Sequence, residues 1–161
     1  MALADTYHLS WTCYGQWLHG DVRGYVDHKH NVPGEPYEHD NPLFLNADAN
    51  RMTEAACWLT DEQRRTAQGA IAEACAFRRW RLYAVNVQPD HSHVAVSSEE
   101  ARGVRARQIL KDRATRALRE VDNSRRHWWT EGGKVEVVTN EVHLATVIDY
   151  IENKQKFPKV R

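Results

Sequence analysis

The pattern of apolar and polar positions predicts a strand near the N-terminus, followed by a segment without regular structure. Residues 5–14 alternate between the two kinds of position and are rich in aromatic and β-branched side chains, which is typical of a strand. Residues 15–50 are rich in glycine and proline and show no sustained period. We expect them to form a long irregular insertion, which compact domains usually keep only for a purpose.

A helix and a hairpin follow the insertion. Thr60 and Gln63 have the spacing of a capping box and predict a helix that runs to about Arg79. Its apolar positions recur at helical spacing at Ala67, Ile71, Ala74 and Cys75. Residues 80–87 and 91–97 both have a strand pattern, and the Gln-Pro-Asp turn between them makes a β-hairpin.

A second long helix is predicted over residues 102–121. Its apolar positions are Ala106, Leu110, Ala114, Ala117 and Val121. Arginines gather on the opposite side of this helix at Arg102, Arg105, Arg113, Arg116 and Arg119. The helix is therefore expected to bury one face and to present a row of positive charges on the other.

The rest of the chain predicts one more strand and one more helix. Residues 128–139 contain a valine-rich strand pattern after two glycines. Asn140 can cap a last helix, whose apolar positions are Leu144, Val147, Ile148 and Ile151. The complete order predicts an α+β fold: a ferredoxin-like βαββαβ antiparallel sheet with an added C-terminal helix that carries Tyr150. The length fits one domain over residues 1–161.

Charge is balanced overall but distributed unevenly. The 22 basic and 22 acidic residues cancel. Residues 101–161 nevertheless hold 14 basic and 8 acidic side chains, whereas residues 1–60 hold 3 and 8. A basic C-terminal part on a neutral chain indicates a local site for a polyanion, although a solvated charged surface would give the same composition.

Cysteine spacing and hydropathy exclude several classes of protein. The three cysteines show no CxxC spacing, which argues against a disulfide scaffold or a zinc ribbon. No apolar run approaches the roughly 18 residues of a membrane helix, and no signal segment is recognised. We therefore expect a cytoplasmic protein with no membrane partner.

His91 and His93 are the first candidate site residues. Side chains two residues apart on a strand point to the same side, so both imidazoles could reach one metal ion. The spacing alone is weak evidence, because nine histidines often produce such a pair by chance, and His28 and His30 form a second one. The first pair is favoured because it lies on a predicted strand after a Pro-Asp turn.

Tyr150 is the second candidate. It lies on the last predicted helix, about 100° from the centre of the apolar face, where a tyrosine usually packs its ring at the edge of a core. Asn153 and Lys154 lie one helical turn further on the same side. Gln155 would be about 140° around from the tyrosine in an ideal helix.

Taken in order, these motifs resemble the HUH endonuclease superfamily. Residues 88–96, Gln-Pro-Asp-His-Ser-His-Val-Ala-Val, are similar to the Pro-Asp/Asn-His-x-His-hydrophobic strand of single-tyrosine transposases, including the REP-associated tyrosine transposases. Residues 7–15 are similar to the first strand of that family. Two Trp residues at 128–129, two Gly residues at 132–133 and Glu-Val-His-Leu at 141–144 lead into Tyr-Ile-Glu-Asn-Lys-Gln at 150–155, in the family's order.

The resemblance implies metal-dependent nicking and rejoining of single-stranded DNA, often at sites marked by a hairpin, by a protein that is commonly a homodimer. His91 and His93 match the metal-binding pair, and Tyr150 matches the nucleophile that forms a covalent phosphotyrosine intermediate. The third ligand of such transposases is a polar side chain shortly after the tyrosine, here Gln155 or Asn153. We favour Gln155, on the assumption that the helix ends there. Two imidazoles and an amide oxygen suit Mg²⁺ or Mn²⁺.

Basic and aromatic residues are candidates for DNA contacts. The candidate contacts to the DNA backbone are Arg105, Arg113, Arg116 and Lys154. The aromatic residues that could stack on unpaired bases are Trp11, Tyr14, Trp17, Trp128 and Trp129, although core packing is the more common role of such residues.

Two other functions remain open. Position 92 is serine where the family usually has a hydrophobic residue, and position 154 is lysine, which cannot be a ligand when protonated. These departures are compatible with a domesticated relative that binds DNA hairpins without cutting them. A metal hydrolase built on His91 and His93 is the other possibility, but no obvious acidic third ligand lies near the pair.

Overall fold

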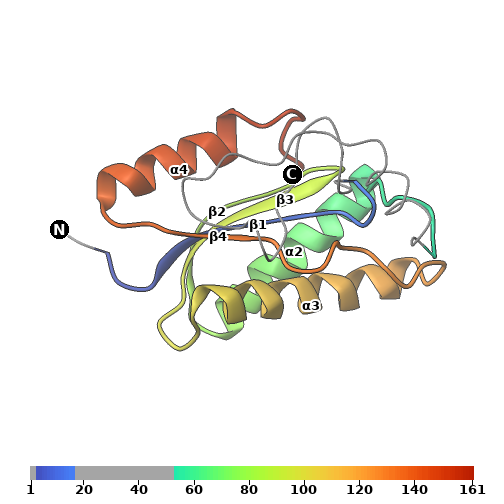
Figure 1. The fold of residues 1–161 in the computed structure, drawn as a ribbon, viewed down its shortest axis with the longest axis horizontal. Helices are drawn as coiled ribbons and strands as arrows, with labels where there is room; N and C mark the ends of the chain where they lie inside the picture. The colour runs from blue at the N-terminus through green and yellow to red at the C-terminus, as the bar shows by residue number, and fades with distance from the viewer. Residues whose placement is uncertain (1–2, 17–52) are drawn as a thin grey trace, which may run out of the picture.

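A computed structural model describes residues 3–16 and 53–161 and confirms the predicted order of elements (Figure 1). The strands are β1 (Thr6–Thr12), β2 (Arg81–Val87), β3 (His91–Ser97) and β4 (Lys134–Val137). The helices are α2 (Asp61–Phe77), α3 (Gly103–Val121) and α4 (Glu141–Asn153). From residue 17 onward, the predicted insertion lies outside the described residues.

The strands form one antiparallel sheet in the order β2-β3-β1-β4, with β1 between β3 and β4. This is the predicted ferredoxin-like arrangement. Figure 1 shows α2 and α3 on one face of the sheet and α4 on the other. Alternate residues of each strand therefore serve two different environments. None of the helices described within residues 53–161 has the length and hydrophobicity needed to cross a bilayer.

The face that α2 and α3 cover forms the larger hydrophobic core. The strands contribute Leu9, Trp11, Val94 and Val96, and the helices contribute Ala67, Ile71, Leu110 and Ala114. The capping box of Thr60 and Gln63 is present at the start of α2, as predicted. The predicted apolar face of α3 is wrong at Val121, which is 51% exposed because it lies on the last turn, beyond the packed part of the helix.

A smaller core lies under α4. The sheet contributes Ala84 and Ala95, and the helix contributes Leu144, Val147 and Ile151. Asn140 caps α4 by accepting a hydrogen bond from the backbone N–H of His143, as predicted. The two alanines are small, so the helix can pack closely on the sheet. This contact fixes the position of α4 above β2 and β3.

Two glycines lead the chain into β4. Gly132 and Gly133 have φ angles of +79° and +133°, in the region that favours glycine. A Cβ atom on Gly133 would overlap the backbone carbonyl oxygen of Ser10. Gly133 therefore allows the start of β4 to approach β1 and pair with it.

Candidate active site

Strand β3 and helix α4 bring the candidate residues to the face of the sheet that α4 covers. His91 and His93 lie two residues apart on β3 and therefore share this face. His93 pairs with Ser10 on β1 and with Asn86 on β2. The side-chain amide of Asn86 donates a hydrogen bond of 3.0 Å to the carbonyl of Ile151, which ties α4 to this part of the sheet.

Four aromatic rings meet beneath and beside α4. The ring centroids of His91 and His93 are 4.9 Å apart, and those of His93 and Tyr150 are 5.4 Å apart in an edge-to-face arrangement. A third imidazole, that of His8 on β1, lies 5.1 Å from His93 and 6.0 Å from Tyr150. The structure therefore brings the predicted phenol and the predicted imidazole pair together within one chain.

A hydrogen bond to Asp90 fixes the orientation of the His91 ring. Its Nδ1 atom lies 2.7 Å from Oδ1 of Asp90, whose side chain is 6% exposed. Burial raises the pKa of this carboxyl, but the hydrogen bond from His91 and the charges of His91 and Lys156 lower it by more, so the net pKa is below its ordinary value. The ionised carboxylate can only accept, so Nδ1 carries the proton that it donates to Asp90. In a neutral ring with the proton on Nδ1, the Nε2 atom presents a lone pair.

Gln155 reaches the site because α4 ends before it. The helix stops at Asn153, and Lys154 is its C-cap. The side-chain N–H of Gln155 donates to the carbonyl of Tyr150 at 3.1 Å, which turns its Oε1 atom to within 2.9 Å of Nε2 of His91. Asn153 instead donates to Asp149 on the exposed side of the helix. The structure thus brings Gln155, and not Asn153, to the imidazoles.

The donor set fits a divalent ion. In the described part of the chain, no three His, Cys, Asp or Glu side chains are arranged to hold a metal, so a third donor would be of another kind. Nε2 of His91 and Oε1 of Gln155 are two lone-pair atoms 2.9 Å apart. Two such atoms do not form a hydrogen bond with each other. When each ligand atom lies about 2.1 Å from an octahedral ion, however, neighbouring ligand atoms are about 3 Å apart, as these two are. Mg²⁺ or Mn²⁺ would also retain positions for phosphate oxygens.

His8 is the residue at this site that the sequence motifs did not single out. Its Nε2 atom lies 2.9 Å from Nδ1 of His93. Burial lowers the pKa of His93 to about 3, helped by the charges of His91 and His8, and burial also lowers the pKa of His8. Both rings are therefore neutral at pH 7, and a single proton lies between Nε2 of His8 and Nδ1 of His93. If Nδ1 of His93 donates it, Nε2 of His93 keeps a lone pair for a metal.

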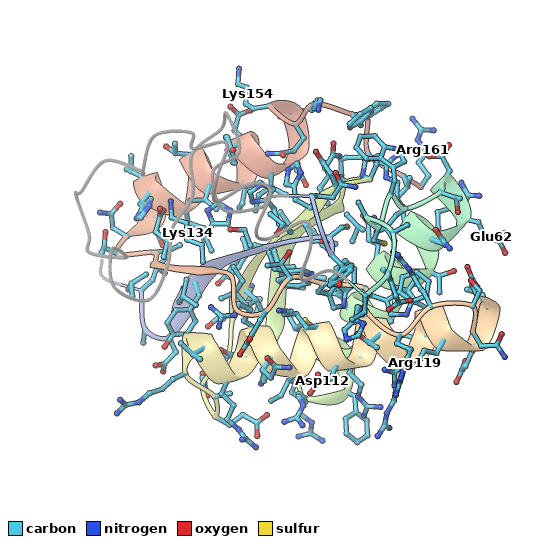
Figure 2. All side chains as sticks on the ribbon, turned by 45° about the vertical axis from the view of Figure 1, so that its right-hand side comes forward. Glu62, Asp112, Arg119, Lys134, Lys154 and Arg161 are labelled. Carbon is cyan, nitrogen blue, oxygen red and sulfur yellow. The ribbon has the colours of Figure 1, made fainter. Side chains whose placement is uncertain are left out.

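The candidate DNA-binding arginines lie on the other side of the sheet. Arg105, Arg113 and Arg116 are exposed on α3, as the helical projection predicts. Figure 2 shows Arg119 of α3 and Lys154 at opposite sides of the molecule, with Lys154 extending outward at the end of α4. The structure thus places Lys154 near the end of the helix that carries Tyr150, whereas the arginines form a separate surface.

The prediction of base-stacking aromatic residues is wrong for Trp11 and Trp128. Both are 2% exposed, because they fill the core between the sheet and the helices. Trp129 is half-buried, with its indole N–H donating to Thr115, and Tyr14 stacks on the ring of His127. Trp17 lies outside the described residues.

Comparisons with known proteins bear on the family and the fold. Residues 52–154 match the family model for IS200-like transposases. The structure of the REP-associated tyrosine transposase bound to a REP hairpin has the same fold, with a TM-score of 0.53 and 12% identity. The match covers 93% of this chain and 66% of that one, so the chain spans just under two thirds of the neighbour's length.

A second match is the crystal structure of a protein assigned as a transposase from Deinococcus radiodurans R1. Its TM-score is 0.49 at 18% identity, and the match covers 96% of this chain and 92% of that one. No curated protein matches the sequence. Because the family model covers well over half of the chain, the protein belongs to the IS200-like transposases, the tyrosine transposase family that its motifs resemble.

Proposed function

We propose that the protein nicks and rejoins single-stranded DNA in a metal-dependent reaction that passes through a covalent bond to Tyr150. The observation that carries this proposal is the position of the phenol ring, 5.4 Å from the ring of His93. Gln155 adds an amide oxygen at His91 in the same place. Membership of a transposase family and the DNA hairpin bound by the structural neighbour support DNA as the substrate.

His91, His93 and Gln155 would hold the divalent ion, Mg²⁺ or Mn²⁺. When bound, the ion would polarise the scissile phosphate. Asp90 and His8 would orient the two imidazoles through their Nδ1 atoms, so that each ring keeps Nε2 for the metal. These two contacts come from different elements, the turn before β3 and strand β1.

Tyr150 would act as the nucleophile. It is 44% exposed, so a DNA strand can approach it. Its hydroxyl oxygen attacks the phosphorus atom and gives up its proton to solvent, while the bond from phosphorus to the 3′ oxygen breaks. The 3′ oxygen leaves with the electron pair and takes up a proton, and the 5′ phosphate stays on the tyrosine. Attack by a 3′ hydroxyl reverses the step, so rejoining needs no ATP.

The departures that keep a non-cutting relative possible both lie away from this geometry. Ser92 is completely buried and, as a neighbour of His91 and His93 on the strand, points to the other face of the sheet. Lys154 extends outward, and Gln155 supplies the amide group in its place. Neither residue separates the phenol from the imidazoles.

The test incubates hairpin oligonucleotides carrying single-stranded flanks with the protein and Mn²⁺. We expect an SDS-stable protein–DNA adduct that disappears in Tyr150→Phe, a variant that keeps the ring packed against His93. Binding of the same oligonucleotide should survive in that variant. Tight binding without any adduct in the unaltered protein would instead identify a hairpin-binding relative that does not cut.

A further inference from the structure

An aromatic pair beside the candidate active site is not used by the proposed reaction. The rings of Trp58 and Phe157 meet edge to face, with centroids 5.7 Å apart and planes at 83°. Trp58 is 53% exposed, whereas the other tryptophans in the described residues are buried or half-buried. An edge-to-face contact covers at most one face of an indole. Much of the Trp58 ring therefore remains open to a ligand.

Hydrogen bonds from backbone N–H groups tie the chain at both aromatic residues to the turn that precedes His91. The N–H of Leu59, next to Trp58, donates to the carbonyl of Pro89 at 2.9 Å. The N–H of Phe157 donates to the side-chain carbonyl of Gln88 at 2.7 Å. The aromatic pair is thus held in a fixed position relative to the strand that carries the imidazoles.

The cation of Lys156 contacts both the Phe157 ring and Asp90, the partner of His91. Nζ of Lys156 is 3.9 Å from Oδ2 of Asp90 and 5.4 Å from the centre of the Phe157 ring. Its side chain is 64% exposed. An exposed amine over one ring of an aromatic pair whose other ring, Trp58, is exposed matches a nucleotide, because its phosphate is negative and its base is flat.

The exposed part of the Trp58 side chain contributes little to the stability of the fold, because an indole stabilises a protein mainly through the area that it buries. Phe77 provides a comparison within the same chain. It is 79% exposed at the end of α2, and its position at the far end of that helix from Thr60 places it away from the aromatic pair. Of Trp58 and Phe77, Trp58 is the one whose neighbouring backbone is hydrogen-bonded to the turn before His91.

We propose that Trp58, supported by Phe157, is a stacking platform for one unpaired base of the strand whose phosphate reacts at Tyr150, and that Lys156 neutralises a phosphate next to that base. This subsite rests on the proposed function. Because every base has a π-face, the platform favours an unstacked nucleotide over a paired one without selecting its sequence.

The test measures equilibrium binding of hairpin oligonucleotides in the Tyr150→Phe background, with one abasic nucleotide moved along the single-stranded flank. Trp58→Ala should weaken binding of the intact oligonucleotide by about tenfold, in the range that one stacked base contributes. One abasic position should cause a similar loss, and the two losses should not add. Trp58→Phe should recover most of the binding, and Phe77→Ala should match the parent.

A second measurement needs no substitution at Trp58. A 2-aminopurine at the position found in the abasic scan, or at each flank position in turn, should lose fluorescence on binding because it stacks on the indole. Additive losses throughout the scan, or no quenching at any position, would overturn the platform. Adduct formation by the unaltered protein is scored separately: its absence would count against the proposed reaction, whereas the binding cycle reports on Trp58 alone.

Discussion

The two faces of the sheet differ in what their residues contribute. The face under α2 and α3 is packed with large side chains such as Leu9, Trp11 and Leu110, each at most 2% exposed. The face under α4 is apolar only around residues such as Ala95, and further along β3 it turns into a group of imidazoles. Neighbouring residues of one strand thus belong either to the closed core or to the open site. Substitutions on one face should therefore change the free energy of unfolding, and substitutions on the other should change DNA cleavage.

The largest effect should come from removing a proposed metal ligand on the α4 face. His91→Ala should reduce adduct formation on the order of a thousandfold, because a bound ion supplies several kcal/mol of transition-state stabilisation. The free energy of unfolding should change by no more than about 1 kcal/mol, since His91 is only partly buried. Urea denaturation and a quantitative adduct assay measure the two. A variant that cuts at the parent rate would show that His91 is not a ligand.

The opposite result, a loss of stability without a loss of activity, is expected on the face under α2 and α3, here called the closed face. Leu110→Ala should lower the free energy of unfolding by about 2–5 kcal/mol, because it leaves a cavity at a fully buried position. Conditions in which the variant stays folded should leave its adduct yield near that of the parent. A large loss of activity without a loss of stability would show that the two faces are coupled.

His8→Phe sharpens the comparison within the α4 face. The substitution keeps a ring against His93 and Tyr150 but removes the partner of His93 Nδ1. The affinity for Mn²⁺ should fall by about 10–100-fold, as for other residues that orient a metal ligand, and higher Mn²⁺ should recover adduct formation. His127→Phe is the matched control and should keep the parent's Mn²⁺ affinity. Equal affinities in the two variants would remove His8 from the site.

The smallest effect concerns a buried lysine on the closed face. Burial lowers the pKa of Lys111 to about 8, and its amine donates to the carbonyls of Thr130 and Gly132. Between about pH 8 and the ordinary lysine pKa of 10.5, the unfolded chain binds more protons than the folded one, so this group makes stability rise with pH. The stability of the parent should therefore rise relative to Lys111→Met across this window. A constant difference between the two proteins would contradict the shift.

Local signals in the sequence were sufficient for the fold and for part of the site. Strand alternation placed His91 and His93 on one face, and the caps at Thr60 and Asn140 fixed where two helices begin. The position of Gln155 followed from the expected end of the last helix, which the structure has at Asn153.

Residues whose position depends on pairing between distant segments were missed. His8 reaches the site because it pairs with Ala95 across two strands, a register that spacing along the chain does not give. Trp58 precedes the capping box in a segment without a period, so no pattern indicated its exposure. The error at Trp11 was avoidable, because strand alternation places it on the same face as Leu9.

The central claim is that the phenol of Tyr150 attacks DNA beside the two imidazoles. Mass spectrometry of the protease-digested adduct tests it directly, because it identifies the residue that carries the nucleotide. We predict that the covalent phosphodiester maps to Tyr150. A nucleotide found on another tyrosine, such as Tyr14 or Tyr83, or on no tyrosine, would contradict the account.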